Sequence, residues 1–225
     1  MQKVLDTGKI RHAIGTYGLD QILTAETMAH IELFRFDRHE HLCKAEEQLD
    51  YLLFLIEGKA KVYMPQKNGK ALLLQFYNPL KVIGDIEFMT MDHANSNIQA
   101  IEETYCLAVP MEVIRKCQLD DPAFLRYMCA SLGDKLFRLS KYSSQNLLYP
   151  LENRVASYIL AHEKSGCAGS MHSMTEVAEL LGTSYRHLLR TFTNLCKQGA
   201  IVKMRDRFEI LDIGLLEELA RDLYE

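Results

Sequence analysis

The sequence predicts an α+β protein, in which an N-terminal β-roll is followed by a long central helix and a C-terminal winged helix-turn-helix. Three observations predict it. Between residues 31 and 110, short runs of β-forming residues recur with turn signals between them. Residues 121–146 carry an amphipathic helical pattern interrupted only by Gly133. Residues 173–199 contain two shorter helical patterns joined by Gly182.

The β-roll is expected within residues 1–120. Residues 1–30 are interpreted as a helical lead-in, because the β-type runs begin only after them. Asn68-Gly69 lies between two of these runs, and this dipeptide tolerates the positive φ of a hairpin turn. Antiparallel strands at this spacing are typical of a barrel or roll. The predicted strands are 51–56, 61–64, 72–76, 97–101 and 105–109.

The central helix is expected over residues 121–148. Asp121-Pro122 is a helix start signal, since proline fits the first turn of a helix. Five apolar residues then follow at steps of 4, 3, 4 and 3, which is the seam of a coiled coil. The seam indicates a dimerisation helix, although a helix lying on its own domain needs the same stripe. The candidate dimer-interface residues are Leu125, Cys129, Leu132, Leu136 and Leu139.

The helix-turn-helix is expected within a third part of the chain, residues 149–225, after a break at Tyr149-Pro150. Ser173 and Glu176 form a capping box at the start of the first helix. Gly182 supplies the tight turn, and Ser184 is the expected N-cap of the second helix, residues 184–197. Residues 201–203 and 208–211 are expected to form a two-stranded wing.

Charge indicates what this unit does. The whole chain has a formal net charge of −4, yet residues 182–207 contain six basic residues and one acidic residue. A local basic face of this kind is what a DNA-reading helix needs. The alternative is a plain helical hairpin with a solvated basic face. The candidate DNA-binding residues are Ser173, Ser184, Tyr185, Arg186, His187, Arg190, Lys203 and Arg205.

Composition excludes several other classes. No apolar run is long enough for a membrane span, and the first residues lack the apolar core of a secretion signal. The six cysteines show neither CxxC nor metal-finger spacing. We therefore expect a cytoplasmic protein with reduced thiols and no contact with a membrane. No catalytic triad spacing or nucleotide loop is present, so an enzyme is not expected.

Several segments resemble the Crp/Fnr family of transcription regulators. Residues 182–190, followed by 199–201, resemble its recognition helix. A strand of the family's sensor is resembled by residues 53–58, and its phosphate-binding cassette by residues 82–88. The resemblance to the YeiL branch lies in residues 100–103 and 106–111, together with residues 184–189. The resemblance implies a cyclic-nucleotide-binding-like sensor, a dimer and a palindromic operator. The implied partners are double-stranded DNA, a second copy of the chain, RNA polymerase and an unidentified small-molecule or redox effector.

The sensor departs from the family pattern. Gly84-Asp85 matches the pair that takes the ribose hydroxyl of cyclic AMP, but no arginine occurs from residue 81 to 100 to pair with a phosphate. We therefore expect no useful affinity for cyclic AMP. The N-terminal cysteine cluster of iron–sulfur relatives is also missing, since the first cysteine is Cys43. The candidate effector-pocket residues are Gly84, Asp85, Ile86, Asn95, Ser96 and Ser140.

An alternative function rests on histidines. His39, His41 and Glu46 resemble half of a cupin metal motif, and alternate strand residues share one face. Leu53 stands where the cupin glycine belongs, and His93 is the remaining candidate ligand. This pattern would suit a cupin-like enzyme, or a metal or redox sensor, fused to a DNA-binding domain. The simpler interpretation is a pair of surface histidines on an edge strand with no metal. A third possibility is a constitutive DNA-binding dimer whose sensor is only a scaffold.

Overall fold

The computed structural model describes residues 1–65, 71–164, 173–204, 208–220 and 223. The chain forms two compact units, Met1–Phe137 and Arg138–Glu225. The division falls within helix α5 (Pro122–Leu148). The predicted α+β class is confirmed, with a β-roll, a long helix and a helix-turn-helix in that order.

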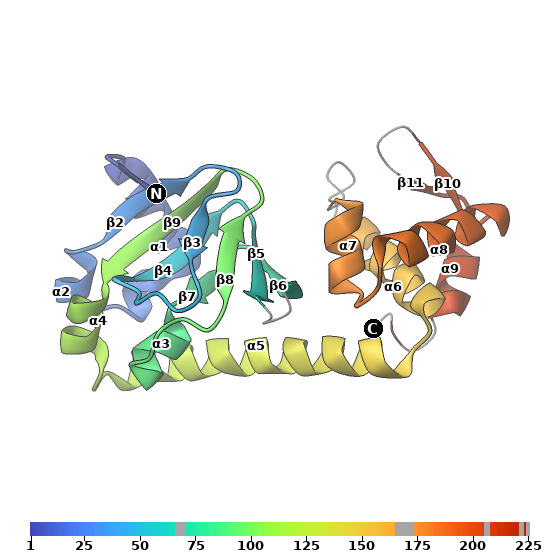
Figure 1. Ribbon diagram of the computed structural model, residues 1–225. Helices are drawn as coiled ribbons and strands as arrows, with labels where there is room; N and C mark the ends of the chain where they lie inside the picture. Colours follow the sequence, from blue (N-terminus) through green and yellow to red (C-terminus); the bar gives the residue numbers. More distant parts are fainter. Residues whose placement is uncertain (66–70, 165–172, 205–207, 221–222, 224–225) are drawn as a thin grey trace. The chain divides into compact units, whose positions relative to one another are not determined.

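The first unit is a roll of two antiparallel sheets (Figure 1). One sheet has the strand order β1-β2-β9-β4-β7, and the other has the order β3-β8-β5-β6. The predicted runs all form strands, and β5 pairs with β6 as the hairpin signal requires. The hairpin dipeptide Asn68-Gly69 itself lies outside the described residues. The strands are β1 (Gln2–Val4), β2 (Glu32–Phe36), β3 (His41–Cys43), β4 (Tyr51–Glu57), β5 (Ala60–Pro65), β6 (Ala71–Tyr77), β7 (Lys81–Ile83), β8 (Asn97–Ala100) and β9 (Thr104–Pro110).

Strand β4 is buried on both faces, so its sheet separates two apolar cores. Its alternate residues Leu52 and Phe54 pack into a core that also contains helical side chains, whereas Leu53 and Leu55 face the core inside the roll. Burial on both faces accounts for an apolar run without polar alternation. The helices of this unit are α1 (Thr7–Tyr17), the 3-10 turn η1 (Leu19–Gln21), α2 (Ala25–Met28), α3 (Asp85–Thr90), α4 (Met111–Gln118) and the first part of α5.

The helical interpretation of residues 1–30 was wrong at its beginning. Residues 2–4 form strand β1, which pairs with β2 through Lys3 and Phe34. A three-residue strand has too little sequence to show a period, and its partner lies about thirty residues away. The helices α1 and α2 follow this strand, and Asp6 caps α1 by accepting a hydrogen bond from the backbone N–H of Lys9 at 2.8 Å.

Helix α5 begins where Asp121-Pro122 predicts. The Asp121 side chain accepts hydrogen bonds from the backbone N–H groups of Ala123 and Phe124, at 2.8 and 3.1 Å. Phe124 and Met128 are fully buried in the first core. Farther along, residues 136–144 are all exposed. One face of the helix is therefore packed against the first core near its N-terminus, and its later turns carry apolar side chains that are exposed.

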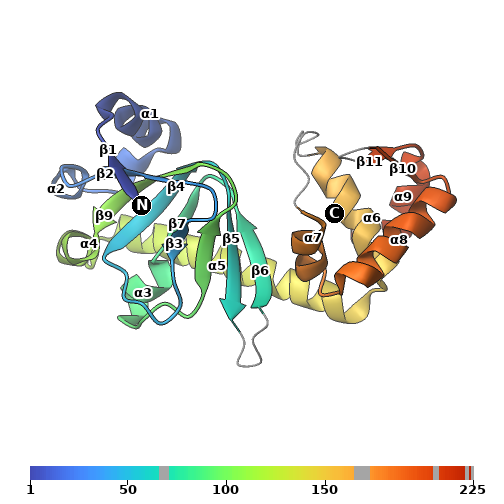
Figure 2. The same cartoon turned by 45° about the horizontal axis from the view of Figure 1, so that its top comes forward.

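The second unit is helical with a two-stranded sheet (Figure 2). The antiparallel pair β10–β11 is the predicted wing, and its tip, residues 205–207, lies outside the described residues. One apolar core joins the helices through Val155, Leu188, Phe192 and Leu216. The elements are α6 (Leu151–Lys164), α7 (Met174–Leu180), α8 (Tyr185–Lys197), β10 (Ile201–Lys203), β11 (Phe208–Ile210) and α9 (Ile213–Ala220).

Candidate effector site and nucleic-acid interface

The cassette motif places Asp85 at the first position of α3. Gly84 before it has a φ of 96°, and a Cβ there would lie 3.3 Å from the backbone oxygen of Tyr51. Glycine is therefore required for both its conformation and its close approach to β4. The turn directs the Asp85 side chain inward, where it is only 2 % exposed.

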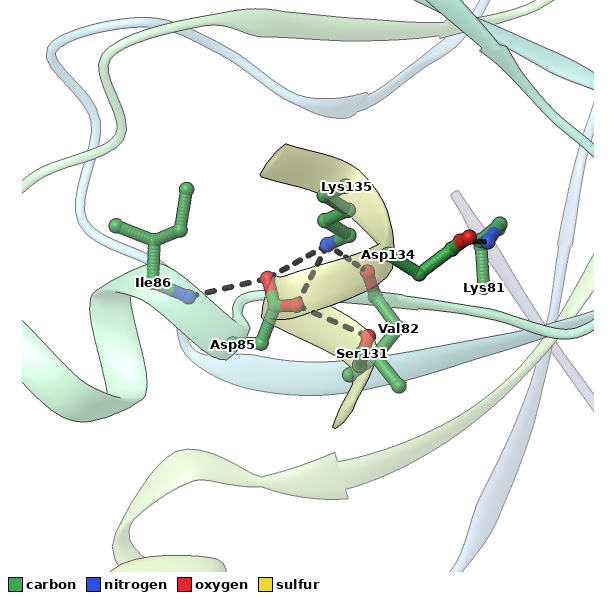
Figure 3. A network of polar contacts seen from close by, with 7 residues as sticks. All are labelled: Lys81, Val82, Asp85, Ile86, Ser131, Asp134 and Lys135. Carbon is green, nitrogen blue, oxygen red and sulfur yellow. Dashed lines mark hydrogen bonds and ion pairs between the residues drawn. The ribbon is translucent and has the colours of Figure 1, made fainter. Parts of the chain in front are cut away.

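The Asp85 carboxylate is fully engaged by groups of this chain (Figure 3). Lys135 of α5 donates to both carboxylate oxygens, at 2.7 and 2.6 Å, and its third donor reaches the backbone oxygen of Val82 at 2.7 Å. Ser131 donates at 3.3 Å, and the backbone N–H of Ile86 donates at 3.0 Å. A carboxylate has about four lone-pair sites and an ammonium group has three donors. Both charged groups thus have their hydrogen-bonding capacity met from within the chain.

The charges around the Asp85–Lys135 pair do not favour the binding of an anion there. Lys135 is 8 % exposed, and burial lowers its pKa while the Asp85 carboxylate opposes that shift. Burial also raises the pKa of Glu87, and the negative charge of Asp85 raises it further. Beside the pair, Lys81 is bound to Asp134. Each cation thus has an acidic partner, and an extra carboxyl group lies near Asp85.

The other candidate pocket residues differ in their surroundings. Ile86 and Asn95 are exposed, and Ser96 is half-buried with its backbone oxygen accepting from the Cys43 thiol at 3.6 Å. Ser140 is an exposed residue of α5 in the second unit. The structure brings Gly84 and Asp85 together with two residues that the motif did not identify, Ser131 and Lys135. Their only sequence signal is that they lie one helical turn apart on α5.

The geometry does not favour the cupin alternative. His39 is not part of a strand but lies in a turn with a φ of 73°, so the alternation argument that placed it beside His41 was wrong. His41 begins the edge strand β3, and its Nε2 lies 2.8 Å from the hydroxyl oxygen of Tyr63. Within the described residues, no three His, Cys, Asp or Glu side chains are grouped so that they could hold a metal ion.

The helix-turn-helix has the local structure that its sequence predicts. Ser173 accepts from the backbone N–H of Glu176, and the Glu176 carboxylate accepts from the backbone N–H of Ser173, which completes the capping box. Gly182 has a φ of 60° in the turn. Ser184 caps α8 by accepting from the backbone N–H of His187 at 3.2 Å.

Helix α8 presents an open basic face. Its inner face buries Leu188, Phe192 and Leu195, and the outward residues at its N-terminal end are all exposed. Tyr185 is 50 % exposed. The helix contains three basic residues and no acidic residue. The exposed candidates are Tyr185, Arg186, His187 and Arg190, and the same face continues through Thr193, Asn194 and Lys197, which the motif did not single out.

The remaining DNA and dimer candidates lie on the surface to different degrees. Ser173, Ser184 and Lys203 are exposed, whereas Arg205 lies outside the described residues. Along α5, Leu125 and Leu132 are half-buried, and exposure then increases, reaching 66 % at Leu136. Phe137 and Tyr142, which the heptad pattern omitted, are also exposed there. Cys129 and Leu139 complete the exposed seam positions.

Comparison with known proteins agrees with this architecture. Residues 33–121 match the family described as "Cyclic nucleotide-binding domain", and residues 153–219 match the "Crp-like helix-turn-helix domain". Among the described residues, no helix is both long enough and apolar enough to pass through a bilayer.

Relatives match over nearly the whole chain. The regulatory protein YeiL of Escherichia coli O157:H7 is 34% identical over 198 residues, covering 88% of this chain and 90% of the relative. A CRP-like cAMP-activated global transcriptional regulator of Mycobacterium tuberculosis is 20% identical, with 82% and 86% covered. The crystal structure of a CRP-family transcriptional regulator from Thermus thermophilus superimposes with a TM-score of 0.70 at 20% identity, covering 83% of this chain and 96% of that one. The chain therefore belongs to the Crp/Fnr family of transcription regulators.

Proposed function

We propose that two copies of the chain bind a palindromic operator, each reading one half-site with α8. The observation that carries the proposal is the exposed, acid-free face at the capped start of this helix. Arginine pairs bidentately with guanine in the major groove, and Arg186 and Arg190 lie one turn apart on that face. Ser173 and Ser184 lie at helix N-termini, which suit the binding of phosphate oxygens. Lys203 and Arg205 would contact the phosphates of the DNA backbone.

The proposal assigns a task to each part of the chain. Residues 1–120 form the sensor, residues 121–148 the dimerisation helix and residues 149–225 the DNA-binding domain. A twofold dimer places two recognition helices about 34 Å apart, one turn of the double helix, which is why the operator is expected to be a palindrome. In this proposal the protein works in the cytoplasm with RNA polymerase as a partner, and it has no catalytic step.

The reading helix is tested with an operator selected from random duplexes. Arg186→Ala is expected to weaken operator binding by about 1–3 kcal/mol, because one bidentate base contact is lost. Arg186→Lys retains the charge but not the planar fork, so it should lose specificity while keeping its attraction to phosphates. Fluorescence anisotropy at fixed salt measures both. An Arg186→Ala variant that binds the operator as tightly as the wild type would exclude α8 as the reader.

Cyclic AMP is not the proposed effector. The ribose-binding role assigned to Asp85 would require displacing Lys135 or Ser131, because their hydrogen bonds already occupy its oxygens. A phosphate would then lie near Asp85 and Glu87 with no arginine between residues 81 and 100. Titration calorimetry is expected to show no binding at micromolar cyclic AMP. Sub-micromolar affinity would overturn this part of the proposal.

The same ion pair favours a second candidate, a regulator whose sensor is a scaffold. Lys135 of α5 is joined to Asp85 of α3 without any added molecule. The chain's own side chains thus connect α5 to α3, so this contact needs no effector. Native mass spectrometry of protein purified without oxygen tests this candidate, and a copurifying molecule that changes operator affinity would exclude it.

A further inference from the structure

The short turn between α7 and α8 is held by side chains from outside the helix-turn-helix. The carbonyl groups at the end of a helix lack partners within it and must find others. Here, the backbone N–H groups of Gly182 and Thr183 satisfy the carbonyls of Glu179 and Ala178. The next two carbonyls, those of Leu180 and Leu181, receive hydrogen bonds from side chains instead.

Those side chains are Asn146 and Arg154. The Asn146 amide, two residues before the end of α5, donates to the Leu180 oxygen at 3.3 Å. The Arg154 guanidinium, on the first turn of α6, donates to the Leu181 oxygen. Arg154 also donates to the Asn146 side-chain oxygen at 2.8 Å, so the two side chains act as a unit.

One further hydrogen bond and one close approach hold the Asn146 and Arg154 side chains in place. The Nε of Arg154 donates to the backbone oxygen of Tyr149 at 3.1 Å, so one guanidinium joins the α5–α6 junction to the α7–α8 turn. A Cβ at Gly182 would lie 3.4 Å from the Cγ and Nδ2 of Asn146, so the turn passes directly against the amide. A planar guanidinium with several bonds has little freedom to reorient.

We propose that Asn146 and Arg154 are positioning residues that set the angle at which α8 is presented to DNA. The inference rests on the proposed function, in which α8 reads base edges. The apolar face of α8 attaches it to the core, but apolar contacts are non-directional. The hydrogen bonds at the turn fix the direction of the helix start, where Arg186 lies. Bidentate base contacts demand such accuracy, whereas phosphate attraction does not.

The arrangement also connects α5 to base reading. Asn146 belongs to α5, and the Leu180 carbonyl that it contacts lies four residues before the N-cap Ser184. A rotation of the last turn of α5 would therefore move the turn that precedes α8. Loss of either side chain should weaken operator binding while leaving non-specific DNA binding intact.

The test measures operator and non-specific duplex affinities at one salt concentration for full-length variants. Asn146→Ala removes both contacts of the amide, whereas Asn146→Asp keeps the acceptor for Arg154 but not the donor to Leu180. Arg154→Lys keeps the charge but cannot reach three acceptors at once. Each variant is expected to lose about tenfold in operator affinity, roughly the free energy of one hydrogen bond, with non-specific affinity unchanged. The Asn146→Ala/Arg154→Lys pair should lose less than the sum of the two.

Gln198→Ala is the matched control. Gln198, the C-cap of α8, donates to Glu152 of α6 at 3.0 Å, so this contact also joins α8 to α6 but at the end of α8 opposite to the turn. It should leave both affinities unchanged. Equal losses in both affinities, or wild-type operator affinity in all three variants, would overturn the positioning role. Arg186→Ala in the same assay separates the two proposals, because an unchanged operator affinity in that variant removes the reading function itself.

Discussion

Replacing Asp85 by asparagine is expected to destabilise the first unit by about 3–5 kcal/mol, because the ammonium group of Lys135 is left buried without a counter-charge. Asp85 is 2 % exposed and Lys135 is 8 % exposed, so water cannot substitute for the lost carboxylate. Hydrogen exchange resolved by mass spectrometry would locate the change, with amides of β4 and β7 losing protection while those of α8 keep theirs. Unchanged protection in β7 would show that the pair does not stabilise the roll.

The destabilisation of Asp85→Asn should depend on pH, and the pKa of Lys135 gives the direction of that dependence. Burial already lowers the pKa of Lys135, and Asp85 is the first of the charges that oppose the shift. Without Asp85 the folded-state pKa falls further below the unfolded value, so the unfolded chain binds the proton more strongly. The stability of Asp85→Asn should therefore rise with pH, and its deficit relative to the wild type should shrink as Lys135 loses its proton.

The matched control removes both charges. Lys135→Met alone leaves a buried carboxylate that retains only the donors from Ile86 and Ser131. The Asp85→Asn/Lys135→Met double variant holds no buried charge at this position and should recover most of the loss, since an uncharged replacement of a buried pair is often near neutral. A double variant with the summed losses of both single variants would show that the residues do not act as a pair.

Only one partner of the Asp85–Lys135 pair could be predicted from the sequence. The Gly84-Asp85 motif locates the acid, because glycine before an inward-facing acid is a local pattern. Lys135 carries no comparable signal, since a lysine on an amphipathic helix ordinarily indicates a solvated face. Its burial depends on contact with a residue fifty positions earlier. Strand β1 was missed for the same reason, because its partner β2 lies far along the chain.

The helix-turn-helix was more predictable because its signals are local. The capping box at Ser173, the turn at Gly182 and the cap at Ser184 each lie within a few residues of the groups they satisfy. The contacts of Asn146 and Arg154 with the turn span 34 and 27 residues and have no such signature. Spacing alone thus predicts which face of α8 is exposed, but it does not predict which side chains set the orientation of that helix.

Leu136→Asp is expected to separate the proposed dimer and to weaken operator binding by about 10²–10⁴-fold, because two linked half-site contacts become one. Leu136 is 66 % exposed in one chain, so the charge should cost that chain little. Leu132→Asp probes the same seam, but Leu132 is half-buried in its own unit and its replacement can also disturb that unit. Sedimentation at several concentrations reports the dimer, and anisotropy with full and half operators reports the binding.

The control must add one negative charge to the same helix away from the seam. Gln145→Glu does so about two and a half turns after Leu136, on the opposite side of α5. It should remain dimeric and bind the full operator as the wild type does. If Leu136→Asp also sediments as a dimer, the apolar side chains of α5 do not form the interface. The exposed run through Phe137 and Tyr142 would then need another partner, because a helix with large apolar side chains in the open is seldom left uncovered.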